Sequence, residues 1–354
     1  MRKQKDGANT DQNTDWWRPD RHADRRPLLL TRNRIKAAFR SFLEAEGFTE
    51  VECGQVQLSP GNETHLHAMA VAQQDPGGDI STRYLHTSPE FAMKKLIAGG
   101  ETRIFDFARV FRARERGALH APEFTMLEWY RTEEPYEALM EDCERLLALA
   151  AETVGTKHFE FRSVICDPNE KAERLTVAEA FDRYAGINLL ATTPGGAPDR
   201  DRLFDAVSKA NIRTASDDTW ADLFSRVMVE KIDPHLGIGR PTILCEYPIA
   251  EAALARPKPS DPLVAERFEL FVCGVELANA FCELTDAKEQ RQRFESDMTL
   301  KEKLYGERYP IDETLLEALA FMPPTSGIAL GFDRLVMLAT HAPHIDHVIW
   351  TPFI

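Results

Sequence analysis

The chain has 354 residues, of which 43% are hydrophobic and 28% are charged, and its formal net charge is −14. This length and composition indicate a soluble globular protein with one large domain or two small ones. The acidic balance argues against a broad nucleic-acid-binding surface, which is normally basic.

The first half of the chain begins with a polar segment, residues 1–25, that predicts a mostly disordered tail. Apolar spacing and turn residues then mark the elements that follow. These are a helix over 26–47, a strand over 48–58, an irregular stretch over 62–80, a short strand over 83–86, a helix from Ser88-Pro89 to Gly99-Gly100, a hairpin over 105–131, a helix over 136–154 and further helices within 175–235.

The second half carries more strands than the first. Its predicted elements are a strand over 242–247, a proline-rich loop over 255–262, an antiparallel pair over 266–273 and 275–284 about Gly274, a charged helix near 286–304, a loop over 322–327, a strand over 328–330, a helix over 331–340 and a strand over 348–353. Strands that pair with sequence neighbours indicate an α+β fold around an antiparallel sheet flanked by helices. We expect one domain over 26–354 with a helical insertion at about 136–235.

The spacing of the cysteines and the absence of long apolar segments indicate the cellular compartment in which the protein works. No C-x-x-C pair occurs, so we expect buried free thiols in a reducing cytoplasm; the six are Cys53, Cys143, Cys166, Cys245, Cys273 and Cys282. No apolar run reaches the length of a membrane span, and the amino-terminal segment lacks a signal-peptide core. His341, His344 and His347 recur every three residues, but Pro343 interrupts a helix there, and we interpret them as surface or packing histidines.

The hairpin over 105–131 organises the chain. Two strand-like runs, rich in Phe, Trp and Tyr, enclose a charged loop that carries Arg112, Arg114, Glu115 and Arg116. Such a loop is often just a solvated tip. Guanidinium groups nevertheless fork onto phosphate oxygens and keep their charge at any working pH, so the loop also suits a phosphate site.

Two further segments supply groups that an ATP site needs. In GVELANAFCEL, Glu276 is embedded among apolar residues, where a carboxylate is costly unless it meets a cation such as Mg²⁺. Glu283 falls on the opposite face of that strand unless a bulge intervenes. In SGIALGFDRL, Gly331 lets a flat ligand approach the backbone, and Arg334 stands in the first turn of a helix, where a cation suggests an anion elsewhere. No P-loop and no G-x-G-x-x-G occur.

These segments together carry a resemblance. FRARERGALHAPEFTMLEWY resembles motif 2 of class II aminoacyl-tRNA synthetases and SGIALGFDRLVML resembles motif 3, while TSPEFAMKKL, EFTMLEWY and GVELANAFCELTDA are similar to the lysyl branch. The similarity covers roughly residues 26–354. WYR after EFTMLE and the alanine in GIALG resemble a free-standing branch without the anticodon-binding barrel, which attaches β-lysine to a lysine side chain of translation elongation factor P.

The resemblance implies an AMP-forming ligase that uses ATP and Mg²⁺. Arg112 and Arg334 would be the catalytic cations, on the α- and γ-phosphates respectively. Glu276 and Glu283 would carry Mg²⁺, and Glu283 would also face the amino acid. We expect a homodimer, formed near residues 30–60, that takes elongation factor P rather than tRNA as its acceptor.

For the nucleotide base, the resemblance implies a stack on Phe124, a floor at Gly331 and a contact near Leu277. The hairpin departs from the family pattern, because Arg112 is followed by Ala113 and Arg114 where relatives have Asn and Glu. The adenine-recognising carboxylate has either moved to Glu115 or been lost. We expect Arg114 to face the phosphate site as an extra cation.

For the amino acid, the resemblance implies a pocket of carboxylates. Glu90, after Ser88 and Pro89, would bind the backbone-side ammonium, while Glu128 and Tyr130 would receive the terminal one. An unpaired buried ammonium would be heavily penalised, so a doubly cationic substrate needs more than one acid.

Residue 329 bears on which amino acid is used. Ala329 stands where tRNA-charging relatives have glycine, and its methyl group should disfavour α-lysine relative to β-lysine. Two alternatives remain open. One is a lysine-tRNA ligase, disfavoured by the missing anticodon module and the acidic charge. The other is a non-catalytic synthetase-like regulator, disfavoured by the presence of the arginines and glutamates that catalysis needs.

Overall fold

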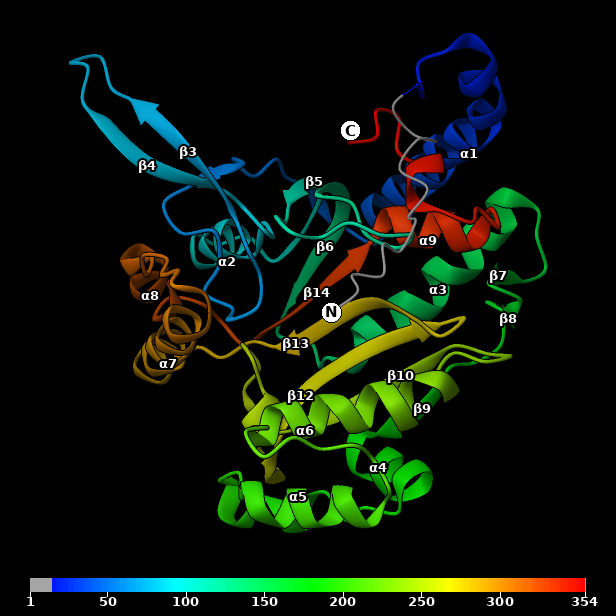
Figure 1. Cartoon of the computed structure of the whole chain (residues 1–354). Helices are drawn as coiled ribbons and strands as arrows, with labels where there is room; N and C mark the ends of the chain where they lie inside the picture. Colours follow the sequence, from blue (N-terminus) through cyan, green and yellow to red (C-terminus); the bar gives the residue numbers. More distant parts are fainter. Residues whose placement is uncertain (1–14, 354) are drawn as a thin grey trace, which may run out of the picture.

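The computed structural model describes residues 15–353 and is built around one large sheet (Figure 1). The sheet has nine strands in the order β1-β5-β6-β14-β13-β12-β10-β9, with β11 paired to β12. Its strands are β1 (Thr49–Glu50), β5 (Arg103–Phe111), β6 (Glu123–Thr132), β9 (Glu173–Thr176), β10 (Thr242–Pro248), β11 (Pro257–Lys258), β12 (Asp261–Val272), β13 (Val275–Cys282) and β14 (Thr325–Gly331). Only the edge pairs β1–β5 and β9–β10 are parallel. The predicted α+β fold with an antiparallel sheet is confirmed.

Helices cover this sheet and extend it. They are α1 (Pro19–Ala45), α2 (Glu90–Ala98), α3 (Glu137–Val154), α4 (Val177–Ala185), α5 (Arg200–Lys209), α6 (Trp220–Val227), α7 (Ala287–Tyr305), α8 (Glu313–Leu319) and α9 (Phe332–Ala339). Within residues 15–353, none of them combines the length and the apolar character that crossing a membrane requires.

The two faces of the central strands have different roles. Successive side chains of a strand point to opposite faces. On one face, Leu127 and Trp129 of β6 and Ile328 and Leu330 of β14 join the main core, together with side chains of α1, α3 and α9. On the other face, β14 presents only small residues, and this face forms the candidate site described below.

The helix α1 corrects the predicted tail. It begins at Pro19 rather than near residue 26, so residues 19–25 are helical. Proline suits the first turn of a helix because its missing N–H would have no partner there. Arg25, which is buried, donates to the carbonyl oxygens of Asp346 (2.8 Å) and Ile349, and this tertiary contact holds the first turns of α1 on the body. Residues 1–14, the rest of the predicted tail, lie outside the described residues.

Several other predictions of local structure were wrong. Residues 62–80 are not all irregular, because β3 (Met69–Gln74) pairs with β4 (Ile80–Leu85) in a mostly exposed hairpin that extends away from the body in Figure 1. The predicted strand over 48–58 is reduced to β1 and to β2 (Val56–Gln57). Helix α8 was not predicted. At the chain end, 348–353 form turns instead of a strand, although Val348 and Ile349 are buried in the main core.

The helical block at 136–235 divides into two parts. α3 packs in the main core, and the short strands β7 (Phe159–Phe161), β8 (Val164–Cys166) and β9 interrupt the block. α4, α5 and α6 form a second core against β10 and β12, with Phe181 and Phe224 stacked at a centroid distance of 5.1 Å. The second core therefore begins at Leu175 of β9, whereas α3 belongs to the main core.

All six cysteines are free, as the spacing predicted. Five are buried, and Cys53 is half-buried. Burial raises the pKa of the Cys143 thiol. These side chains pack as small hydrophobic groups.

A buried ion pair fixes the start of α9. Asp333, with no exposed surface, accepts from Arg32 Nε of α1 (3.0 Å) and from the backbone N–H of Thr125 in β6 (2.7 Å). Arg32 also donates to the Thr125 hydroxyl (2.8 Å). The Asp333 carboxylate thus connects α9, to which it belongs, with α1 and with strand β6 of the central sheet.

Replacing Asp333 by Asn should destabilise the protein strongly. The substitution keeps the shape but leaves the Arg32 charge buried without an opposite charge, and breaking a buried pair in this way costs about 3–5 kcal/mol. Urea unfolding monitored by circular dichroism would measure it. Glu313→Gln, which removes the exposed pair with Arg291, is the control and should leave the midpoint almost unchanged. Equal losses in the two variants would contradict the assignment.

Candidate active site

A cavity of about 370 Å³ lies over the sheet face opposite the main core. Walls come from α2, the loop after β5, and the N-terminal turn of α9, while β6, β12, β13 and β14 supply the floor. The structure brings ten of the predicted residues to this one cavity: Ser88, Glu90, Arg112, Glu115, Phe124, Glu276, Leu277, Ala329, Gly331 and Arg334. These residues come from five separate segments of the chain.

Small residues of β14 leave space above the strand that forms the floor of the cavity. Ala329 is paired with Glu128 of β6 on one side and with Asn279 of β13 on the other. At Gly327, an added Cβ would lie 2.3 Å from the Tyr130 ring and 2.6 Å from a Glu283 carboxylate oxygen, so only glycine fits. The glycine therefore allows Tyr130 and Glu283 to lie over the strand.

Two arginines mark one end of the cavity. Arg334 donates from Nε to the carbonyl of Leu119 and from a terminal nitrogen to the carbonyl of Glu276, both at 3.1 Å. Arg112 lies over the Phe124 ring at 5.4 Å. Burial lowers the pKa of Arg334, and the nearby Glu276 carboxylate opposes this shift. Two guanidinium groups that are only partly neutralised form a site for a polyanion.

Arg114 does not belong to this site. It adopts a left-handed backbone conformation (φ 66°), its side chain is mostly exposed, and it forms an ion pair with Glu307. This conformation turns the side chain away from the cavity that Arg112 lines. In this conformation Arg114 does not line the cavity, so the predicted contact with phosphate is not formed here.

The other end of the cavity is acidic. Lys94 of α2 lies with its Nζ 2.6 Å from both Glu90 and Glu283. Glu128 accepts from Ser88 Oγ and from the Tyr130 hydroxyl, each at 2.6 Å. We call Glu90, Glu128, Glu283 and Lys94 the acid pocket. Two of its three carboxylates, Glu90 and Glu283, share the one ammonium group.

Most of the acid pocket lies one layer behind the cavity wall. Glu128, Glu283 and Tyr130 are no more than 3% exposed and do not line the cavity, whereas Ser88 and Glu90 do. Pro89 is also buried; it holds its two neighbours at the start of α2, where the Glu90 N–H donates to Ser88 Oγ (3.1 Å). The predicted substrate residues are thus contiguous, but they differ in depth.

Burial and mutual repulsion perturb the ionisation of the acid pocket. Burial, with the Glu90 charge adding to it, raises the pKa of Glu128 to about 8. Burial also raises the pKa of Glu283 to about 7, although Lys94 opposes the shift. The pKa of Lys94 is raised, because Glu283 and Glu90 outweigh the effect of its burial. Carboxylates with raised pKa values favour a cationic ligand that would restore their charge.

The donor groups fit Mg²⁺ only in part. The pairing register of β12 and β13 shifts at Leu270, so that Leu277 has no partner, and Glu276 reaches the cavity. Glu276 is exposed there. Glu283 is instead bonded to Lys94. Mg²⁺ commonly takes one or two carboxylates together with substrate phosphates, and Glu276 beside the arginines suits that arrangement.

Sequence reasoning missed part of the wall, namely Glu63, His120, Arg267, Glu269 and Asn279. Arg267 and Glu269, an ion pair at 2.7 Å, alternate along β12 with buried Phe268 and Leu270. That alternation of charged and apolar residues could have identified this face of β12 from the sequence. It normally marks a solvent-facing surface, but here the same face lines the cavity.

Comparison with known proteins places the chain in a family. A model of the family of class II tRNA synthetases (D, K and N) matches residues 9–353. The elongation factor P–(R)-beta-lysine ligase of Sodalis glossinidius is 38% identical over 326 residues, which cover 91% of this chain and 93% of the relative. The protein of the same name from Salmonella arizonae is 38% identical over 340 residues, or 94% of this chain and 96% of the relative. The chain therefore belongs to the family of class II tRNA synthetases (D, K and N).

Proposed function

We propose that this protein activates (R)-β-lysine with ATP as an acyl adenylate and transfers it to a lysine side chain of translation elongation factor P. The observation that carries the proposal is one cavity with two arginines at one end and an excess of carboxylates at the other. A polyanion and a dication fit these ends, and ATP and a diamino acid have those charges. The printed names of the relatives support the same substrates.

In the first step, a carboxylate oxygen of the amino acid would bond to the α-phosphorus while the bond to pyrophosphate breaks. Arg112 would stabilise the charge that develops on the α-phosphate, and Arg334 would hold the γ-phosphate. Phe124 would stack on adenine above Gly331, next to Leu277, with Glu115 at the base edge. Mg²⁺, held by Glu276, would neutralise phosphate charge.

In the second step, the deprotonated amine of the acceptor lysine would attack the carbonyl carbon of the adenylate. An amide bond forms, the bond from that carbon to the phosphate oxygen breaks, AMP leaves and the amine loses a proton. No covalent bond to this protein is required, so its contribution is positioning and charge stabilisation.

The acid pocket would hold the two ammonium groups of the substrate. Glu90, on the cavity wall, would meet one ammonium, and Glu128 with Tyr130 the other. Lys94 limits the excess negative charge by neutralising part of it. A neutral or acidic amino acid would leave these buried carboxylates without a partner and would bind poorly.

We also propose a homodimer that works in the cytoplasm. Apolar side chains in the predicted contact region are solvent-exposed in the single chain: Leu30 is 40%, Val56 50% and Leu58 44% exposed. Covering them would favour association, and the molar mass in solution measures it directly. The net charge of −14 favours a protein acceptor over tRNA.

The reaction can be tested with the purified protein, ATP, β-lysine and elongation factor P. We expect the mass of the factor to rise by one lysyl unit, and no charging of bulk tRNA with lysine. Arg112→Ala or Arg334→Ala should lower ATP–pyrophosphate exchange by about 10²–10³-fold. Arg114→Ala, in the same loop but turned outward, is the matched control and should retain most of the activity. Efficient tRNA charging with an unmodified factor would refute the proposal.

Substrate binding should release protons at pH 7. Glu128, with a pKa of about 8, is mostly protonated in the empty protein, and an adjacent ammonium favours its ionised form. Titration calorimetry of β-lysine in buffers of different ionisation enthalpy should give a release of up to about one proton, which declines as the pH rises toward 8.5. Glu128→Gln should lower the release markedly, and Glu283, with a pKa of about 7, would account for the remainder. A pH-independent release that persists in this variant would contradict the assignment.

Residue 329 should set the preference between α- and β-lysine. Ala329 lies on the cavity floor beside Glu128 and Asn279. Ala329→Gly removes one methyl group, and we expect the ratio of kcat/KM for β-lysine over α-lysine to fall by about 10-fold or more, since one methyl group in a pocket is worth about 1–3 kcal/mol. ATP–pyrophosphate exchange with each amino acid would measure it. An unchanged ratio would exclude this role.

A further inference from the structure

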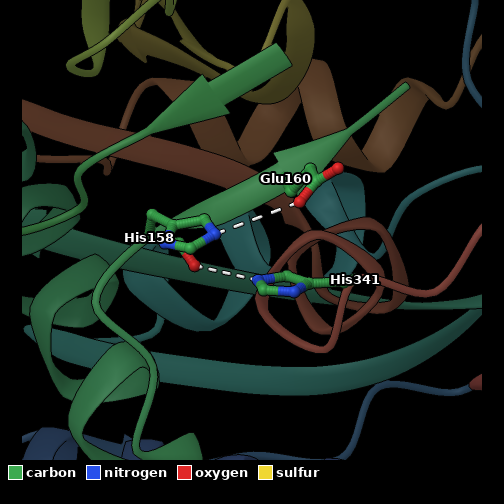
Figure 2. Close-up of side chains that lie close together, drawn as sticks. All are labelled: His158, Glu160 and His341. Carbon is green, nitrogen blue, oxygen red and sulfur yellow. Dashed lines mark hydrogen bonds and ion pairs between the residues drawn. The ribbon is translucent and has the colours of Figure 1, made fainter. Parts of the chain in front are cut away.

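Three side chains with metal-binding atoms lie close together (Figure 2). Glu160 belongs to β7, His158 precedes that strand, and His341 follows α9. Their candidate ligand atoms all lie within 4.8 Å of one another. Within residues 15–353, this is the one group of three or more His, Cys, Asp or Glu side chains with such spacing. None of the three residues lines the cavity.

The histidines are already oriented. His341 Nε2 lies 3.0 Å from the carbonyl oxygen of His158, as the dashed line in Figure 2 marks. An Nε2–H that donates to this carbonyl leaves Nδ1 of His341 with a free lone pair. The two rings stack at a centroid distance of 5.1 Å, and His158 Nε2 is 3.9 Å from a Glu160 oxygen. Metal-binding histidines typically donate their second ring N–H to a carbonyl or carboxylate in this way.

The backbone conformation of His341 is a second feature of this group, separate from its side-chain contacts. His341 has φ 55°, and it occupies the position after α9 where the helix closes through Ala342 N–H to Met337 O (2.9 Å) and His341 N–H to Leu338 O (3.3 Å). Helices that end in this way favour glycine at that position, because a side chain is disfavoured in the left-handed conformation. The left-handed backbone of His341 ends α9 and sets the direction in which its ring leaves the helix end, beside the ring of His158.

We propose that His158, Glu160 and His341 bind a divalent transition-metal ion, with Zn²⁺ the best match. Two imidazoles and one carboxylate are a zinc ligand set that leaves a position for water. Mg²⁺ and Ca²⁺ prefer oxygen ligands and fit poorly. The His158 and Glu160 side chains are 42% and 38% exposed, so the ion can enter from solvent.

The position of this site indicates a structural role. It joins β7 to the C-terminal end of α9, while the N-terminal turn of the same helix carries Arg334 at the cavity. Bound metal would therefore restrain both β7 and α9 and would stabilise the folded chain by mass action. The site is separate from the Mg²⁺ position at Glu276.

Titration calorimetry of the full chain with Zn²⁺, in the absence of ATP, tests the proposal. We expect one tight site, and a rise of several degrees in the unfolding temperature at saturating Zn²⁺. His158→Ala and His341→Gly should each lower the affinity by at least about 100-fold, and Glu160→Gln by at least about 10-fold. Binding that is weak, or equal in wild type and these variants, would overturn the proposal.

Two variants distinguish loss of the metal site from loss of the fold. His341→Gly relieves the backbone at the helix end, so the metal-free variant should unfold at a temperature equal to or above that of the wild type while it loses the metal. His344→Ala is the matched control, because His344 lies in the same segment but outside the cluster, and it should bind Zn²⁺ like the wild type. Loss of binding in His344→Ala would instead assign the ion to the histidines that recur every three residues.

Discussion

The interaction on which the site depends is the sharing of one buried ammonium, that of Lys94, among an excess of carboxylates. Glu90 and Glu283 contact it directly, and Glu128 lies beside them on hydrogen bonds from Ser88 and Tyr130. A buried carboxylate without a cation would lose its proton only at a high pH, as the raised pKa of Glu128 indicates. The empty pocket is therefore electrostatically unsatisfied. In the proposed function, the ammonium groups of the amino acid would relieve that condition, and selectivity for a cationic substrate would follow from the charge balance of the protein itself.

The sheet makes this arrangement possible because one of its faces packs in the main core and the other borders the cavity. One face of β6 and β14 packs Leu127, Trp129, Ile328 and Leu330 into the main core. On the other face, Gly327 carries no side chain, so that Tyr130 of β6 and Glu283, which follows β13, can lie across β14. The Asp333 carboxylate then holds α9 against both α1 and β6. The core thereby determines where Arg334, which we propose to bind phosphate, points.

Much of this could be predicted from local patterns. The hairpin, the strand that carries Glu276 and the segment that carries Arg334 were located because each is short, distinctive and determined by neighbours in sequence. What could not be predicted depends on distant contacts. Arg114 has the right residue type, but its left-handed backbone and the distant Glu307 turn it away. Likewise, residues 19–25 are polar in sequence, and contacts with the distant chain end, such as those of Arg25 and His22, hold this part of the helix on the body. How far a side chain lies behind the cavity wall could not be predicted either, because nothing in the local sequence distinguishes Glu90, on the wall, from Glu128 behind it.

Lys94 has one further consequence for an enzyme that makes an activated acyl group. Such an intermediate acylates any free amine within reach, and the protein's own buried lysine lies directly behind the wall. Two carboxylates hold Lys94 as an ammonium ion, which has no lone pair with which to attack. In the proposed reaction, the contacts that balance the charge would therefore also protect the protein from acylating itself, and they would leave the lysine of the acceptor as the available nucleophile.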